Sequence, residues 1–171
     1  HPQRMALHCL GDAESENGSY SFAELDQRAR AVSVGLRQTV ETGDRVLILL
    51  HSGIVYVTAF FGCLYAGVIA VPDFPPESAA KQHVKRLVSI VDDAQPKAIL
   101  SHSALLDTIN KGLADVPAKH APQVLAIDSL EPRLAGDWRM PDLSRDAVAF
   151  LQYTSGSTAS PKGVIVGHDN L

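Results

Sequence analysis

The residues best suited to chemistry lie in one polar turn near the end of the chain. The apolar segment 149–153 is followed by hydroxyl residues, a glycine and then a lysine; these residues are Thr154, Ser155, Gly156, Ser157, Thr158 and Lys162. Gly156 allows the backbone to approach a ligand closely, and successive N–H groups in such a turn can form a concavity that holds an anion. Lys162 adds a mobile positive charge suited to phosphate oxygens. The pattern predicts a loop that binds phosphate groups.

Composition alone leaves other interpretations of this loop open. Loops rich in serine and glycine are common on protein surfaces, and most of them bind nothing. The loop is not a Walker A motif, because Lys162 lies between Pro161 and Gly163 and the required Gly-Lys-Ser/Thr sequence is absent. Ser155 is not expected to be a covalent nucleophile, because the surrounding residues do not form a Gly-x-Ser-x-Gly elbow.

Alternating strand and helix patterns precede the loop and must position it. Apolar or β-branched runs predict strands at 45–50, 68–71, 97–101 and 123–127, and a further strand that begins after Asp146 and leads into the loop. Helical patterns fall between them. This alternation predicts an α/β fold with a mostly parallel sheet flanked by helices. Ligands in such folds collect outside the carboxyl ends of the strands, where the 154–162 loop is expected to lie.

Start and stop signals define the predicted elements. Ser21 has capping-box spacing with the glutamate three residues later, and Ser78 and Ser103 are expected to cap two later helices. Pro72 is expected to end the second strand, because proline has no N–H for a sheet hydrogen bond. Residues 128–144 show no clear periodicity and are predicted to form a long connecting loop, in which Trp138 is interpreted as a packing anchor.

The uncharged stretch 46–72 is long enough to be considered as a membrane span. Gly53 and Gly67 interrupt it, and the part after Gly67 is β-branched. Strand, buried helix (about 54–66) and strand fit this punctuation better, so no stable membrane insertion is expected.

Composition limits the classes of partner. The chain of 171 residues is 46% hydrophobic and 20% charged, with a formal net charge of −4, which gives no reason to expect nucleic acid or an anionic membrane as a partner. Cys9 and Cys63 are far apart and show no metal-ligand spacing. Two such cysteines favour a reducing compartment, so a cytoplasmic location is expected, with Cys63 as a buried, inert thiol.

The loop also carries a family resemblance. The sequence of residues 153–164 resembles the ATP-phosphate loop of the adenylate-forming (AMP-binding) superfamily, which includes acyl-CoA synthetases, peptide-synthetase adenylation domains and fatty acyl-AMP ligases. Ala159 departs from the glycine that many members carry. The segments 20–25, 43–46 and 66–72 resemble family motifs in the same order. Residues 67–76 are most similar to fatty acyl-AMP ligases.

The resemblance implies a reaction and a set of partners. A fatty acid carboxylate would attack the α-phosphorus of ATP, in the presence of Mg²⁺, and give acyl-AMP and pyrophosphate. Thr154, Ser155, Gly156, Ser157, Thr158 and Lys162 would bind the ATP phosphates, and an acyl carrier protein or polyketide synthase would accept the acyl group. An acyl-CoA synthetase or a peptide-synthetase adenylation domain is the nearest alternative. Acyl chain length and oligomeric state are not encoded in this pattern.

Family members are much longer than this chain. Residues 1–171 are therefore expected to be the N-terminal portion of the AMP-binding domain, and no metal ligands are assigned within them. The family's adenine, ribose and magnesium motifs and its C-terminal lysine would lie beyond Leu171. The 171 residues alone are expected not to adenylate a fatty acid. A non-catalytic nucleotide-binding or interaction fragment is the alternative of a different class.

Overall fold

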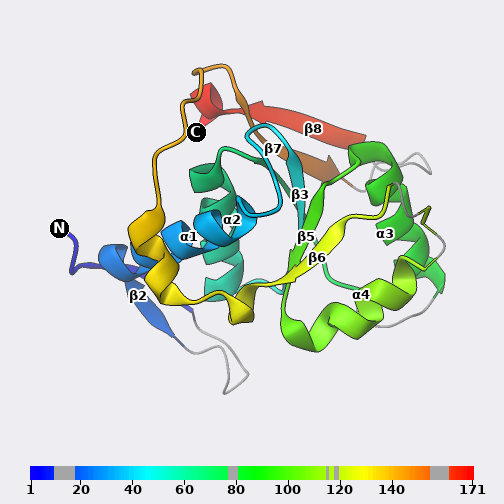
Figure 1. Cartoon of the computed structure of the whole chain (residues 1–171), viewed down its shortest axis with the longest axis horizontal. Helices are drawn as coiled ribbons and strands as arrows, with labels where there is room; N and C mark the ends of the chain where they lie inside the picture. Colours follow the sequence, from blue (N-terminus) through cyan, green and yellow to red (C-terminus); the bar gives the residue numbers. More distant parts are fainter. Residues whose placement is uncertain (10–17, 77–80, 115, 118–119, 155–161) are drawn as a thin grey trace.

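The computed structural model describes residues 1–9, 18–76, 81–114, 116–117, 120–154 and 162–171, without the side chains of residues 81, 82 and 162. In these residues, six strands form a sheet in the order β6-β5-β3-β4-β7-β8 (Figure 1), and β1 and β2 form a separate antiparallel pair. The strands are β1 Met5–His8, β2 Ser19–Ser21, β3 Arg45–Leu49, β4 Ile69–Asp73, β5 Ala98–Ser101, β6 Gln123–Ala126, β7 Val148–Thr154 and β8 Lys162–Gly167. The α-helices are α1 Phe22–Leu36, α2 Ile54–Ala66, α3 Lys81–Ala94 and α4 Leu106–Gly112.

The described part of the chain confirms the predicted α/β class. Strands β6, β5, β3, β4 and β7 run parallel, and only the β7–β8 pair is antiparallel. Helices α1 and α2 cover one face of the sheet, and α3 and α4 cover the other (Figure 1). The sheet is therefore mostly parallel and flanked by helices, as the alternating pattern predicts.

Strand β3 lies in the middle of the sheet and shows why these residues form a parallel strand. Val46 and Ile48 pack against the core under α1 and α2, whereas Leu47 and Leu49 pack against the core under α3 and α4. All four side chains are buried. Successive side chains of a strand point to opposite faces of the sheet, and helices cover both faces here, so all four positions must be apolar.

The first helix confirms its predicted start, and the second confirms both of its predicted boundaries. Ser21 caps α1 with a reciprocal capping box: its hydroxyl accepts from the Glu24 N–H at 3.2 Å, and the Glu24 carboxylate accepts from the Ser21 N–H at 2.7 Å. Gly67 ends α2 with a φ of +72°, a left-handed conformation that favours glycine. Helical spacing places Phe22 on the apolar face of α1, but this residue, the first of the helix, is 54% exposed.

The prediction that Pro72 ends the second strand is wrong. Strand β4 continues to Asp73, with Pro72 opposite Ile48 and Asp73 opposite Leu49 in β3. Proline loses one hydrogen-bond donor, but its fixed φ is compatible with extended backbone, so the pairing with β3 persists.

The connection from β6 to β7 is more ordered than the predicted long loop. It contains two 3-10 helices, η2 Ile127–Ser129 and η3 Pro132–Asp137. Trp138 follows η3, and its indole N–H donates to the Tyr65 carbonyl oxygen at 3.0 Å while the Arg30 guanidinium lies 4.4 Å from its ring centroid. Trp138 is thus a packing anchor, as predicted, and it attaches this connection to α1 and α2.

The stretch 46–72 forms the predicted strand, helix and strand, which are β3, α2 and β4. Among the residues described, no helix combines the length and the apolar character that crossing a bilayer requires. The helix in question, α2, has 13 residues.

Candidate functional site

The predicted phosphate loop joins two antiparallel strands. Thr154 is the last residue of β7, Lys162 is the first residue of β8, and the two are paired across the hairpin. Ser155, Gly156, Ser157 and Thr158 lie outside the described residues, as does the side chain of Lys162. The structure therefore brings the two ends of the loop together at the carboxyl end of β7.

Tyr153 immediately precedes the loop, and its side chain is 6% exposed. Its hydroxyl donates a hydrogen bond to Oδ2 of Asp93 in α3. Burial, reinforced by this hydrogen bond and by the negative charge of Asp93, raises the pKa of Tyr153 well above its ordinary value. The hydroxyl accordingly stays protonated and remains a donor at neutral pH.

Gly163 faces Tyr153 from the opposite strand. A Cβ atom at position 163 would lie 3.2 Å from Cζ and 3.3 Å from Cε2 of the tyrosine ring, closer than ordinary van der Waals contact. The ring therefore occupies the space that a side chain at position 163 would need.

A pocket of about 430 Å³ opens next to Tyr153, at the carboxyl ends of β3, β4 and β7, and its volume lies within the range of sites that hold small molecules. We call it the loop-side pocket. It is lined by Leu50, Ser52, Tyr56, Pro72, Asp73, Phe74, Arg86, Gln152 and Tyr153. The lining combines apolar side chains and aromatic rings with the paired charges of Asp73 and Arg86. The location matches the expected position of ligands in a parallel α/β sheet.

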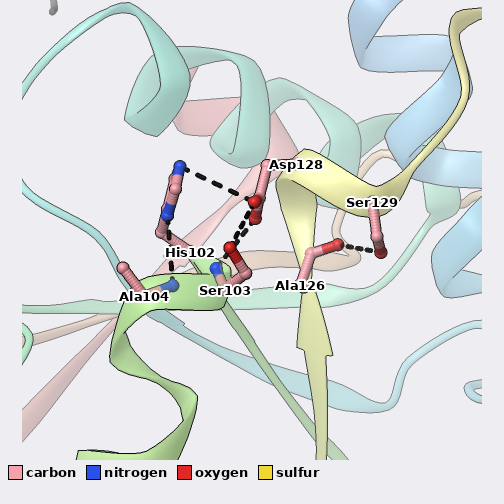
Figure 2. A network of polar contacts seen from close by, with 6 residues as sticks. All are labelled: His102, Ser103, Ala104, Ala126, Asp128 and Ser129. Atoms are coloured by element: carbon pink, nitrogen blue, oxygen red, sulfur yellow. Dashed lines mark hydrogen bonds and ion pairs between the residues drawn. The ribbon is translucent and has the colours of Figure 1, made fainter.

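A second polar cluster directly follows β5 and β6, the two strands at the edge of the sheet farthest from β8 (Figure 2). The Asp128 carboxylate accepts hydrogen bonds from the N–H of Ser103 at 2.8 Å and from its hydroxyl at 2.5 Å, and Nε2 of His102 lies 3.7 Å away. Burial raises the pKa of Asp128, but the hydrogen bonds from Ser103 and the nearby His102 outweigh it, and the net pKa lies below the ordinary value.

This cluster corrects the prediction that Ser103 caps a helix. Residue Ser103 instead begins the short 3-10 helix η1, Ser103–Leu105, and the side chain of His102 occupies the capping position by accepting from the Ala104 N–H at 3.3 Å. The Ser103 hydroxyl donates to Asp128 instead of accepting from a helix N–H. Ser78, the other predicted cap, lies outside the described residues.

Sequence reasoning missed the side chains that support the loop-side pocket. Asp73, Arg86 and Asp93 come from β4 and α3, and they meet their partners only because α3 packs over the ends of β4 and β7. Spacing along the chain does not reveal such contacts. The one available signal was Tyr153, a tyrosine with a polar hydroxyl in a strand expected to be buried.

The described residues do not assemble a metal site. Mg²⁺ prefers carboxylate and other oxygen ligands, and within the described ranges no group of three His, Cys, Asp or Glu side chains could hold a metal ion. Cys63 is fully buried, and burial raises the pKa of its thiol far above the ordinary value, as expected for an inert cysteine.

Comparison with known proteins links this geometry to one family. Residues 1–171 match the family described as AMP-binding enzyme. The medium-chain-fatty-acid–[acyl-carrier-protein] ligase JamA of Moorena producens is 38% identical over 170 residues, which cover 98% of this chain and 29% of that protein. The long-chain-fatty-acid–AMP ligase FadD32 of Mycolicibacterium smegmatis is 41% identical over 152 residues, which cover 88% of this chain and 24% of that protein.

A solved structure gives the same result. The fatty acyl-adenylate ligase from L. pneumophila, in complex with acyl adenylate and pyrophosphate, is 35% identical and superposes with a TM-score of 0.75, covering 91% of this chain and 26% of that one. The chain thus spans about a quarter of the length of the relatives it matches. Since the family match extends over every residue, this chain belongs to the family of AMP-binding enzymes.

Proposed function

We propose that the chain is the N-terminal portion of an AMP-binding (adenylation) domain, and that the full-length protein activates a fatty acid carboxylate to acyl-AMP with release of pyrophosphate. The observation that carries this proposal is the match of the whole chain to the family, together with 35–41% identity to proteins named as fatty acid ligases that form adenylates or load a carrier protein.

The proposed phosphate site is the loop between β7 and β8. Thr154, Ser155, Gly156, Ser157, Thr158 and Lys162 would contact the phosphates of ATP. Negative charge develops on the departing pyrophosphate, and hydroxyl groups, backbone N–H groups and a lysine aimed at it would stabilise the transition state. When bound, Mg²⁺ would neutralise part of the same charge. The described residues offer no cluster of ligands for it, so no residue is assigned to that role.

We propose an acyl carrier protein or a polyketide synthase as the acceptor of the acyl group. The name of JamA, an acyl-carrier-protein ligase, supports a carrier-protein acceptor, and that of FadD32 describes an AMP ligase. The name of FadD32 thus supports acyl-AMP as the activated product.

The test measures fatty-acid-dependent ATP–pyrophosphate exchange by the full-length protein and identifies its products by mass spectrometry. Acyl-AMP is expected to accumulate in the absence of an acceptor and to be consumed when a pantetheinylated carrier protein is added. Absence of any exchange with fatty acids would overturn the proposed reaction. Rapid formation of acyl-CoA on addition of coenzyme A would overturn the acceptor and favour an acyl-CoA synthetase.

A further inference from the structure

We propose that Tyr153 is a positioning residue that holds both ends of the phosphate loop in place, through its hydrogen bond to Asp93 and its contact with Gly163. This inference rests on the proposed phosphate-binding role of the loop. It assigns to Tyr153 no contact with the reacting atoms. Its effect on ATP would be indirect, through the backbone of the residues on either side of the loop.

Tyr153 connects the start of the loop to α3. Thr154 begins the loop, and the residue before it is fixed in two ways: Tyr153 is 6% exposed, and its hydroxyl donates to Asp93. Helix α3 is itself firmly seated, because Leu87, Ile90 and Val91 are each no more than 4% exposed in the core under α3 and α4. The hydroxyl therefore joins the start of the loop to a rigid element.

Tyr153 also makes a contact across the hairpin. Gly163 follows Lys162 at the far end of the loop and is paired with Tyr153. The tyrosine ring lies so near that a Cβ at position 163 would be only 3.2 Å from it. The ring of Tyr153, which belongs to the strand that enters the loop, thus lies against the strand that leaves it.

Charge strengthens the bond between Tyr153 and Asp93. The Tyr153 hydroxyl stays protonated at neutral pH and faces a carboxylate, which makes the hydrogen bond charge-assisted and stronger than one between neutral groups. This bond fixes the residue before Thr154, and Thr154 is itself paired with Lys162 across the hairpin. Binding groups that are already arranged lose less conformational entropy when a ligand binds, so this arrangement favours ATP binding.

The experiment compares Tyr153→Phe with Tyr65→Phe in the full-length protein. The two changes remove the same group: Tyr65 is half-buried, and its hydroxyl donates to Asp26 at 3.1 Å, but this pair joins α1 and α2 away from the loop. Loss of a charge-assisted hydrogen bond that acts on binding predicts a rise of about three- to ten-fold in KM for ATP for Tyr153→Phe. The KM for the fatty acid is expected to stay within about two-fold, because sites that share no contacts behave nearly independently.

Tyr65→Phe is the control for a merely structural effect. It is expected to lower the melting temperature while it leaves KM for ATP unchanged. Gly163→Ala is the second variant at the site: it retains the Tyr153–Asp93 bond but places a Cβ against the ring, and it is also expected to raise KM for ATP. An unchanged KM for ATP in both site variants, or an equal rise in Tyr65→Phe, would overturn the inference.

Equilibrium binding of ATP, measured by calorimetry, separates this inference from the proposed function. A wild-type protein that binds ATP without fatty-acid-dependent exchange would contradict the proposed reaction, and the Kd values of the variants would still test the role of Tyr153. A wild-type protein that binds no ATP would overturn both.

Discussion

Arg86 in α3 binds Asp73 at the end of β4 with a two-pronged ion pair. Its Nη2 lies 2.7 Å from Oδ1, its Nε lies 3.2 Å from Oδ2, and the Asp73 side chain is only 6% exposed. A carboxylate this far from water needs a partner, and the planar guanidinium supplies two donors in a fixed geometry. The pair thereby fixes α3 against the carboxyl edge of the sheet. Both side chains also line the loop-side pocket.

Replacement of Arg86 by alanine is expected to destabilise the protein by about 1–3 kcal/mol, because Asp73 would be left buried and without its partner. Urea denaturation of the full-length protein, followed by fluorescence, measures this change. Arg133→Ala is the matched control: its pair with Glu131 is exposed on both sides, at 81% and 56%, and its loss is expected to cost less than about 0.5 kcal/mol. Equal effects of the two substitutions would contradict the assigned role of the Arg86–Asp73 pair.

Gly62→Ala is expected to destabilise the packing of α1 against α2. A Cβ at position 62 would lie 2.4 Å from Cγ1 and 2.6 Å from Cβ of Val32, and a Cβ atom cannot move away by rotating the side chain. The helices must separate, at a cost of about 1–3 kcal/mol. Gly136→Ala serves as control, because no atom lies within 4 Å of a Cβ at that position. A neutral Gly62→Ala variant in urea unfolding would show that this contact is looser than the structure indicates.

The Ser103–Asp128 contact predicts a stability difference that depends on pH. The folded-state pKa of Asp128 is lowered, so its hydrogen bonds contribute stability above the unfolded pKa, about 3.9, and lose it as the pH falls through the folded value. Ser103→Ala is therefore expected to be less stable than wild type at pH 7, with a difference that shrinks below about pH 4. Free energies of unfolding at several pH values measure this trend.

Ser129→Ala provides the comparison for that experiment. Its hydroxyl donates to the Ala126 carbonyl at 2.7 Å, close to the same cluster (Figure 2), and this bond involves no titrating group. Its effect on stability is expected to be the same at both ends of the pH range. A difference for Ser103→Ala that does not change with pH would contradict the assignment.

Lys162→Ala in the full-length protein is expected to slow ATP–pyrophosphate exchange by about ten-fold or more, because the proposed site loses its only assigned cation for phosphate oxygens. Its backbone position at the start of β8 is retained by alanine, so the melting temperature should change little. Lys111→Ala, in the last turn of α4, is the control for loss of one positive charge elsewhere. Unchanged exchange in Lys162→Ala would remove this lysine from the proposed phosphate site.

The sheet could be predicted from sequence because its signals are local. Val46 and Ile48 belong to an uninterrupted run of apolar residues, which is typical of a buried strand. Gly43 and Gly67 adopt positive φ values where the adjacent elements turn or end. The β1–β2 pair was not predicted, since Met5–His8 is short, with exposed residues at both ends. The 3-10 helices after β6 were not predicted either, because runs of three to six residues are too short to establish a period.

The candidate site could be predicted only in part, for a related reason. Thr154 and Lys162 were proposed by residue type, because hydroxyls, glycine and lysine in one turn are a local pattern. The supporting contacts depend on where α3 lies over the sheet. Asp93 reaches Tyr153 across 60 residues of sequence, and no spacing rule anticipates a contact of that kind.

Strand β7 is paired with β4 through Ala70 and Phe150, and nearly half of the chain separates these two residues. The intervening residues first build β5, α4 and β6 on the opposite side of β3. Contacts between distant residues form slowly, since the chain must close a large loop before they give any stabilisation. During synthesis on the ribosome we therefore expect the β3–β6 portion to fold first, and the two ends of the proposed phosphate loop to be brought together only afterwards, when the β7–β8 hairpin emerges and docks.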